Sequence, residues 1–145
     1  MLVAYKFYSK FDTTVEMPGT DDLEIEIAHS MCRGRCPVYT VEVQSTGNVI
    51  FTGEQYTTKI GRQEFKIEKD QLSSIASVLY DFGYFSVDKG IFCDDRLVLD
   101  ASFTSVSVKW QGLERESEAC LDHSSETLLS LVDRIENILN IDRWK

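Results

Sequence analysis

Apolar and polar residues alternate along several short stretches of the chain. In LEIEIAH, at 23–29, leucine and isoleucine side chains face one way and two glutamates face the other. The same period of two recurs in VYTVEVQ and NVIFTG, on either side of a turn around Gly47, and in EFKIE at 64–68. This alternation predicts half-buried strands, and the glycine turn between the middle two predicts a hairpin.

The period changes to that of a helix in two places. At 69–82 apolar residues recur every three or four positions, and Gly83 follows, where a glycine suits the residue after a helix. A second apolar stripe predicts a helix over about 124–140. Beyond it, Trp144 is expected to pack back against the body of the protein.

Between the two helices the sequence predicts another hairpin. SFTSVSVKW, at 102–110, and LERESEACL, at 113–121, are joined by a Gln-Gly turn. The second strand is highly charged, so we expect it near an edge of the sheet. Residues 88–101 are predicted to form a polar loop.

The order of these elements predicts the fold class. Links between strands are short, which favours a mostly antiparallel sheet of about five to seven strands, and both helices can cover one face. The expected fold is an α+β two-layer sandwich. One core is predicted from the periodic apolar positions, namely Val41, Val43, Phe65, Leu72, Ile75, Leu79, Val106, Val108, Leu128, Leu131 and Ile135.

The length of 145 residues suits one domain with one core. We interpret residues 23–140 as that core and residues 1–22 as an N-terminal extension whose LVAYKFY segment matches a short strand. A chain of this size needs no disulfide or metal in order to fold.

The charge balance narrows the classes of partner. The net charge is −9, and a surface this acidic repels nucleic-acid phosphates but suits a basic protein. No apolar run approaches the roughly 20 residues of a membrane span, and no signal peptide opens the chain. We therefore expect a cytoplasmic protein without a nucleic-acid or membrane partner. The sequence does not determine its oligomeric state.

The stretch HSMCRGRCPVY, at 29–39, carries the densest candidate chemistry. Cys32 and Cys36 enclose Gly34, which has Arg33 and Arg35 on either side. A disulfide in so short a loop would stabilise the fold by about 2 kcal/mol. The favoured interpretation is a structural turn, held by a disulfide or by two packed thiols, with the following proline starting the next strand.

Three other interpretations of this loop stay open. Redox chemistry usually uses C-x-x-C at a helix start, whereas this C-x-x-x-C lies between strands. Zinc could be bound by His29, Cys32 and Cys36 with Cys93 or Cys120, although no second pair of close ligands exists. The two arginines could also hold an anion, but solvated loop charges are the simpler interpretation.

A family resemblance rests on the same residues. The chain resembles an uncharacterised bacterial domain family marked by C-x-G-x-C-P-x-Y and a following hairpin. The motif positions are Cys32, Gly34, Cys36, Pro37 and Tyr39, and the hairpin positions are Gly47, Phe51 and Gly53. The resemblance covers about residues 23–140 and implies no activity.

The remaining candidates favour structural roles. Asp94, Asp95 and Asp100 lack the spacing of a calcium loop, and His123 with Glu126 suits a helix cap. No phosphate-binding loop, dinucleotide fingerprint or serine-nucleophile turn is present. The sequence thus favours a protein without a cofactor, a metal or a catalytic residue.

We therefore expect a non-catalytic protein-binding module. A specific form is an acidic inhibitor or immunity-type protein that neutralises a toxin or an enzyme by covering its basic cleft. Its interaction residues would include Arg33, Arg35 and the charged strand with Glu114, Glu116 and Glu118. The alternative is a thiol-redox or zinc protein that works through Cys32 and Cys36.

Overall fold

A computed structural model describes residues 18–32, 34–86, 91–92, 103–120 and 126–145. The expected strand in residues 1–17 and the candidates Arg33, Cys93, Asp94, Asp95, Asp100 and His123 lie outside these residues.

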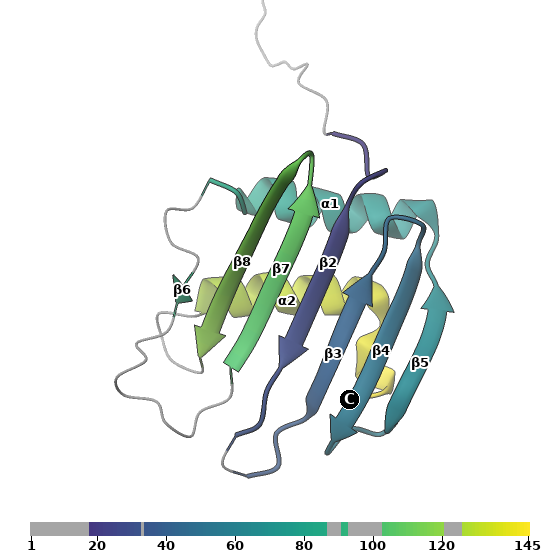
Figure 1. Cartoon of the computed structure of the whole chain (residues 1–145), viewed down its shortest axis with the longest axis vertical. Helices are drawn as coiled ribbons and strands as arrows, with labels where there is room; N and C mark the ends of the chain where they lie inside the picture. Colours follow the sequence, from purple (N-terminus) through teal and green to yellow (C-terminus); the bar gives the residue numbers. More distant parts are fainter. Residues whose placement is uncertain (1–17, 33, 87–90, 93–102, 121–125) are drawn as a thin grey trace, which may run out of the picture.

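The described elements form a sheet and two helices in two layers (Figure 1). The strands are β2 (Glu24–His29), β3 (Val38–Val43), β4 (Asn48–Gln55), β5 (Gly61–Lys66), β6 (Ile91–Phe92), β7 (Phe103–Trp110) and β8 (Leu113–Cys120). The helices are α1 (Lys69–Phe82), α2 (Glu126–Leu139) and a short 3-10 turn, η2 (Ile141–Arg143). Both long helices lie behind the sheet in Figure 1, so the predicted α+β sandwich is confirmed.

The strand order in the sheet is β5-β4-β3-β2-β7-β8-β6. Every pair is antiparallel except the two-residue β6, which lies parallel to β8. β2 is central because it pairs with β3 on one side and with β7 on the other. The charged β8 lies near an edge, since among the described residues only Glu118 and Ala119 of this strand pair with a strand beyond it.

Two strands, β5 and β6, differ from the sequence-based expectation. β5 spans Gly61–Lys66 rather than 64–68, because pairing with β4 extends back to Gly61. At the other end the chain leaves the sheet after Lys66, and the N–H of Glu68 donates to the side chain of Gln71 (2.9 Å) in the first turn of α1. β6 lies inside the stretch that was expected to be a loop.

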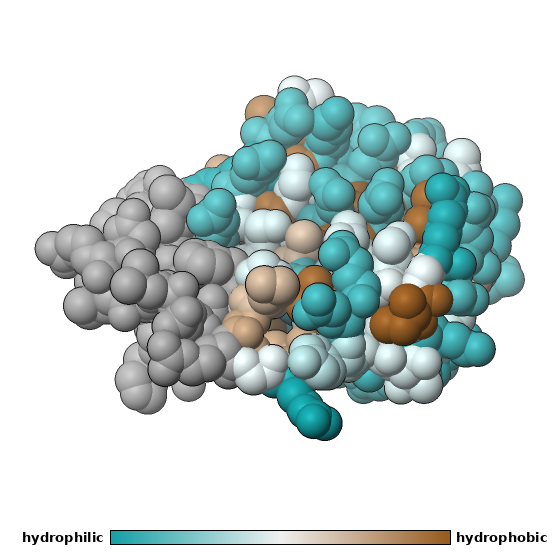
Figure 2. Space-filling model, turned by 60° about the horizontal axis from the view of Figure 1, so that its bottom comes forward, coloured by the Kyte–Doolittle hydropathy of each residue, from teal (hydrophilic) through white to brown (hydrophobic). Residues whose placement is uncertain are grey.

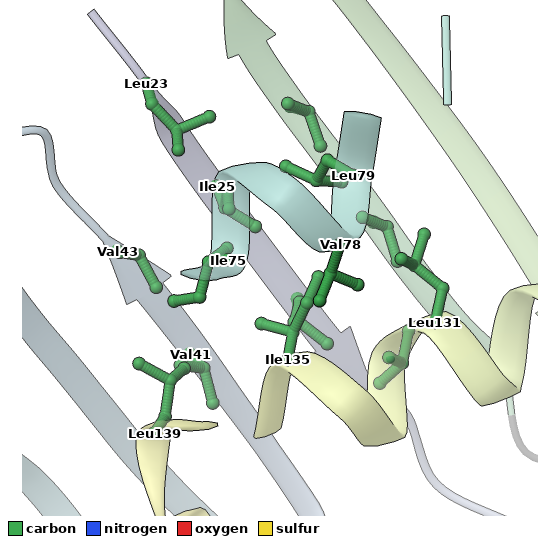
Figure 3. Packing of buried hydrophobic residues seen from close by; sticks show 14 of the residues in the cluster. Leu23, Ile25, Val41, Val43, Ile75, Val78, Leu79, Leu131, Ile135 and Leu139 are labelled. Carbon is green, nitrogen blue, oxygen red and sulfur yellow. The ribbon is translucent and has the colours of Figure 1, made fainter. Parts of the chain in front are cut away.

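The core lies between the helices and one face of the sheet (Figure 3). Ile25, Val41 and Val43 point from the strands toward Ile75 of α1 and Ile135 of α2. All the predicted core residues belong to this cluster, with Phe65 half-buried at its margin. Trp144 packs against it too, with its ring 5.3 Å from Phe51 and 5.2 Å from Phe65.

Gly53 shows how closely the chain packs at the end of β4. A Cβ atom there would overlap the carbonyl oxygen of Lys59, because the β4–β5 loop folds over this residue. The N–H of Lys59 in turn donates to the carbonyl oxygen of Trp144 (3.2 Å). The loop therefore joins the C-terminal segment to the sheet, and this places Lys145 beside the helix layer.

The two faces of the sheet have different surroundings. The inner face carries the core, whereas no helix of the described residues covers the other face, which is turned toward the viewer in Figure 1. We call this second surface the open face. Its side chains alternate with the core residues along β2, β3, β4, β5, β7 and β8.

Candidate functional site

The strand register places three polar side chains in one row on the inner face. His29 of β2 lies opposite Tyr39 of β3 and, on its other side, opposite Thr104 of β7. The rings of His29 and Tyr39 are 4.3 Å apart. Polar groups at this depth need partners, because an unsatisfied buried polar group costs about 1–3 kcal/mol.

Glu136 of α2 supplies the partner. Its side chain is 1% exposed although glutamate is rarely buried. The Tyr39 hydroxyl donates to this carboxylate, 2.9 Å from Oε1 and 2.8 Å from Oε2. Nε2 of His29 lies 2.8 Å from Oε2, and Nδ1 of the same ring lies 3.1 Å from the hydroxyl of Thr104.

A lysine completes this cluster. Nζ of Lys145 lies 3.1 Å from Oε1 of Glu136 and 3.2 Å from a carboxylate oxygen of Asp142. We call Glu136, His29, Tyr39 and Lys145 the carboxylate cluster. It links β2 and β3 to α2 and the end of the chain, so two parts of the chain that are distant in sequence meet at one buried charge.

The pKa values follow from burial and these contacts. Burial alone would raise the pKa of Glu136, but the hydrogen bond and charge of His29, with Lys145 and Tyr39, lower it overall. Burial and the charge of Glu136 raise the pKa of Tyr39 far above its usual range. Burial would lower the pKa of Lys145, but Glu136 outweighs this effect and raises it. The cluster therefore holds an ionised carboxylate, a neutral phenol and an ammonium group.

The carboxylate cluster is suited to structure rather than to catalysis. A general base must reach the proton that it removes from a substrate. Both oxygens of Glu136 already accept hydrogen bonds, and the side chain is almost fully enclosed. Tyr39, the last residue of the sequence motif, thus has a defined role as a donor to a buried carboxylate.

The cysteine loop joins β2 to β3 at one end of the sheet. Cys32 and Cys36 are bridged by a disulfide, with Cα atoms 5.8 Å apart, and Arg35 is exposed in the loop. Both sulfurs are in the bridge and both ring nitrogens of His29 have partners. In the part of the chain that the structure describes, no group of three or more His, Cys, Asp or Glu side chains could hold a metal ion.

Glutamates dominate the open face. Glu24, Glu26, Glu42, Glu54, Glu64, Glu114, Glu116 and Glu118 lie on it, whereas its basic residues are Arg62, Lys66 and Lys109. Two of those bases are near glutamates of the same face, since Arg62 lies 2.7 Å from Glu64 and Lys109 lies 3.8 Å from Glu114. The surface thus has a strong excess of negative charge.

Two of these glutamates are direct neighbours across strands. The register pairs Glu26 of β2 with Glu42 of β3, where side chains start about 5 Å apart. Like charges in this arrangement destabilise a sheet. On the other side of Glu26, Ser107 of β7 lies opposite it, and Glu116 of β8 lies opposite Ser107. The middle of the open face therefore concentrates negative charge, with Lys109, opposite Glu24, as a basic residue beside it.

A shallow hollow of about 540 Å³ lies on the open face beside the cysteine loop. Its floor consists of the small side chains Ala28, Thr40 and Ser105, with Glu54 and Glu118 at its two ends and the 63% exposed Met31 at its rim. Figure 2 brings this end of the molecule forward and shows a mainly hydrophilic surface with separate apolar patches.

The sequence model of DUF6438, a domain of unknown function, matches residues 23–139. The chain belongs to the DUF6438 family. The expected membership in an uncharacterised domain family is confirmed over nearly the same residues. A search of curated proteins finds no match to the chain. No described helix is long and apolar enough to span a membrane.

Sequence reasoning missed Glu136 and the pair Glu26–Glu42. Glu136 stands four residues after Val132 and three before Leu139, so it falls within the apolar stripe of α2. A carboxylate in such a stripe is a signal for a buried polar contact. The Glu26–Glu42 pair could not be found in the same way, because it depends on the register between two strands.

Proposed function

We propose that this protein is a non-catalytic binding module whose open face covers a basic surface of a partner protein. The observation that carries this proposal is the cross-strand pair of Glu26 and Glu42 in the middle of an uncovered sheet face. Such a pair costs folding stability, and a cationic group placed between the two carboxylates would offset that cost.

The shape of the open face supports the same proposal. Small side chains form the floor of the hollow, so the backbone of a partner can approach the sheet closely. The glutamates around it would attract a basic partner and speed the encounter. The enclosed Glu136, in contrast, gives no support to a catalytic role. In its specific form, the proposal is a cytoplasmic inhibitor or immunity-type protein that covers a basic catalytic cleft.

Charge reversal on two faces tests this proposal. The variant Glu26→Lys/Glu42→Lys changes the open face, and Asp81→Lys/Asp133→Lys makes the same change in charge on exposed positions of the helix layer. Each protein is immobilised and incubated with lysate of the native host, and the retained proteins are identified by mass spectrometry. A stoichiometric partner must be retained by wild type and by the helix-layer variant, and lost by the open-face variant.

The purified pair then gives a second readout. The association rate constant should fall as the ionic strength rises, since salt screens the attraction between the open face and a basic partner. Equal retention by the two variants, or an association rate that is indifferent to salt, would contradict the proposal.

A further inference from the structure

β5 ends the sheet on one side. Its six residues pair with β4, and no other described strand lies next to them (Figure 1). The strand contains no proline. An edge strand of this kind presents unpaired N–H and C=O groups that can bond to another strand.

The hydrogen-bonding pattern shows which residues face outward. The N–H of Ile67 donates to the carbonyl oxygen of Gly47 (2.8 Å), and the pairing continues with Phe65 opposite Val49. Hydrogen-bonded pairs alternate along an antiparallel ladder. The backbone groups of Phe65, Gln63 and Gly61 therefore bond to β4, and those of Arg62 and Glu64 point away from the sheet.

We propose that β5 pairs antiparallel with β5 of a second copy of this chain, centred on Gln63. In this register the outward N–H and C=O groups of Arg62 bond to those of Glu64 in the second copy, and the reverse bonds form across the twofold axis. The interface then consists of one continuous ladder over most of β5.

Charge complementarity and the length of the ladder together select this register. Each Arg62 faces a glutamate of the other copy, and each Glu64 faces an arginine. Within one copy the two side chains bond to each other, 2.7 Å apart, and they are 62% and 53% exposed, so each can exchange this neighbour for its counterpart across the interface. Centring the pairing on Glu64 instead would place Glu64 opposite Glu64 and Arg62 opposite Lys66, which is repulsive. Centring it on Phe65 would place Glu64 opposite Lys66, which is attractive, but Arg62 would then lie opposite Glu68, beyond the strand at the start of α1, so only residues 64–66 of each β5 would pair.

Gly61 supports the same register on the inner side of the strand. No atom lies within 4 Å of the place where a Cβ of Gly61 would stand. Pairing centred on Gln63 places Phe65 of the second copy opposite this glycine, so its ring, which packs edge-on against Trp144 of its own copy, meets no Cβ across the interface. The adjacent Ile60 is 63% exposed and would be covered by the aliphatic stem of Lys66 from the second copy.

The dimer would have one consequence for the open face. Because the twofold axis is perpendicular to the sheet, the open faces of both copies would lie on the same side and form one larger acidic surface. The net charge of −9 on each copy opposes association at long range, but at physiological salt this repulsion is screened beyond about 8 Å. The proposal does not depend on the proposed function.

Three charge variants test the pairing. Arg62→Glu places glutamates opposite glutamates, and Glu64→Arg places arginines opposite arginines. The double variant Arg62→Glu/Glu64→Arg exchanges the two charges and restores the complementarity. Molar mass is measured for the full chain by sedimentation equilibrium over a concentration series at physiological salt, and thermal melting checks that each variant is folded.

Wild type and the double variant should dimerise with similar dissociation constants, and each single variant should dissociate about tenfold or more readily. A mixture of the two single variants should form a heterodimer, because both of its cross-interface pairs are attractive. The proposal would be overturned if wild type stayed monomeric, or if the single variants dimerised with the same dissociation constant as wild type.

Discussion

Glutamates on the two sides of the sheet have opposite surroundings. Against the inner face, Glu136 of α2 is enclosed, and a tyrosine, a histidine and a lysine surround its charge. On the open face Glu26 and Glu42 lie side by side across strands and face solvent. A buried charge persists only when partners compensate it, whereas surface charges can be set by binding rather than by folding. The comparison supports a structural role for the enclosed Glu136, and it is the basis on which we propose that the open face binds a partner.

The largest effect should come from Glu136. Its replacement by alanine leaves the Tyr39 hydroxyl and the His29 ring without their acceptor, so the free energy of unfolding should fall by about 3–5 kcal/mol. Denaturant titration measures this loss. Glu54→Ala on the open face is the matched control and should change stability by less than about 0.5 kcal/mol. Equal losses of unfolding free energy in the two variants would contradict the structural role of Glu136.

Removing a donor from the same cluster should have a smaller effect. Tyr39→Phe keeps the ring and its contact with Phe51, 5.3 Å away between centroids, but removes the hydroxyl that donates to Glu136. A hydrogen bond to a charged group is worth about 1.5–3 kcal/mol, and we expect a loss in that range. The variant Tyr56→Phe, at an exposed position, is the control. Unchanged stability in Tyr39→Phe would mean that the carboxylate does not need this donor.

The cysteine loop should contribute about 1–3 kcal/mol to stability, the scale of a short-loop disulfide. The double variant Cys32→Ser/Cys36→Ser should melt at a lower temperature and still bind the partner, because the acidic residues of the open face remain in place. Thermal melting and a binding titration on the same sample give both answers. Lost binding at unchanged stability would instead favour the thiol or metal alternative.

The pH dependence of stability should reveal the contribution of the buried carboxylate cluster. The folded state lowers the pKa of Glu136, so its contribution is present above the pKa of an unfolded glutamate, about 4.3, and is lost as the pH falls through the folded value. Because the folded state raises the pKa values of Lys145 and Tyr39, both groups contribute to the free energy of unfolding below about pH 10, and these contributions are lost as the pH rises further. Stability should therefore be highest between these limits.

Glu136→Gln isolates the acid side of this profile. The difference in unfolding free energy between wild type and this variant should shrink as the pH falls below about 4. Denaturant titrations at a series of pH values check this. A difference that stays constant down to strongly acid pH would show that the charge of Glu136 does not stabilise the fold.

Much of the fold follows from local sequence patterns. Alternation defines β2, β3, β4 and β7, and the glycine after Phe82 ends α1 as expected, with Gly83 at φ 70°. The turn at Gln111 and Gly112 also has positive φ angles, as a tight hairpin requires. These features depend on neighbours in the chain, so the sequence alone could predict them.

The candidate sites depend on contacts between distant segments and were harder to predict. The burial of Glu136 requires that β2 lie between β3 and β7, and that α2 cross the row of His29 and Tyr39. Likewise, Glu26 and Glu42 become neighbours only through the β2–β3 register. Alternation predicts which face a residue occupies, but it does not predict which residue lies beside it on the next strand.

The most direct test of the account compares folding with binding in one variant. Glu26→Gln/Glu42→Gln removes both charges of the cross-strand pair and keeps the size of the side chains. We predict that its free energy of unfolding equals that of wild type or exceeds it by a few tenths of a kcal/mol, because the repulsion is gone. Its association with the partner retained by wild type should be slower by about tenfold. A loss of stability with binding unchanged would contradict the assignment of the open face to interaction.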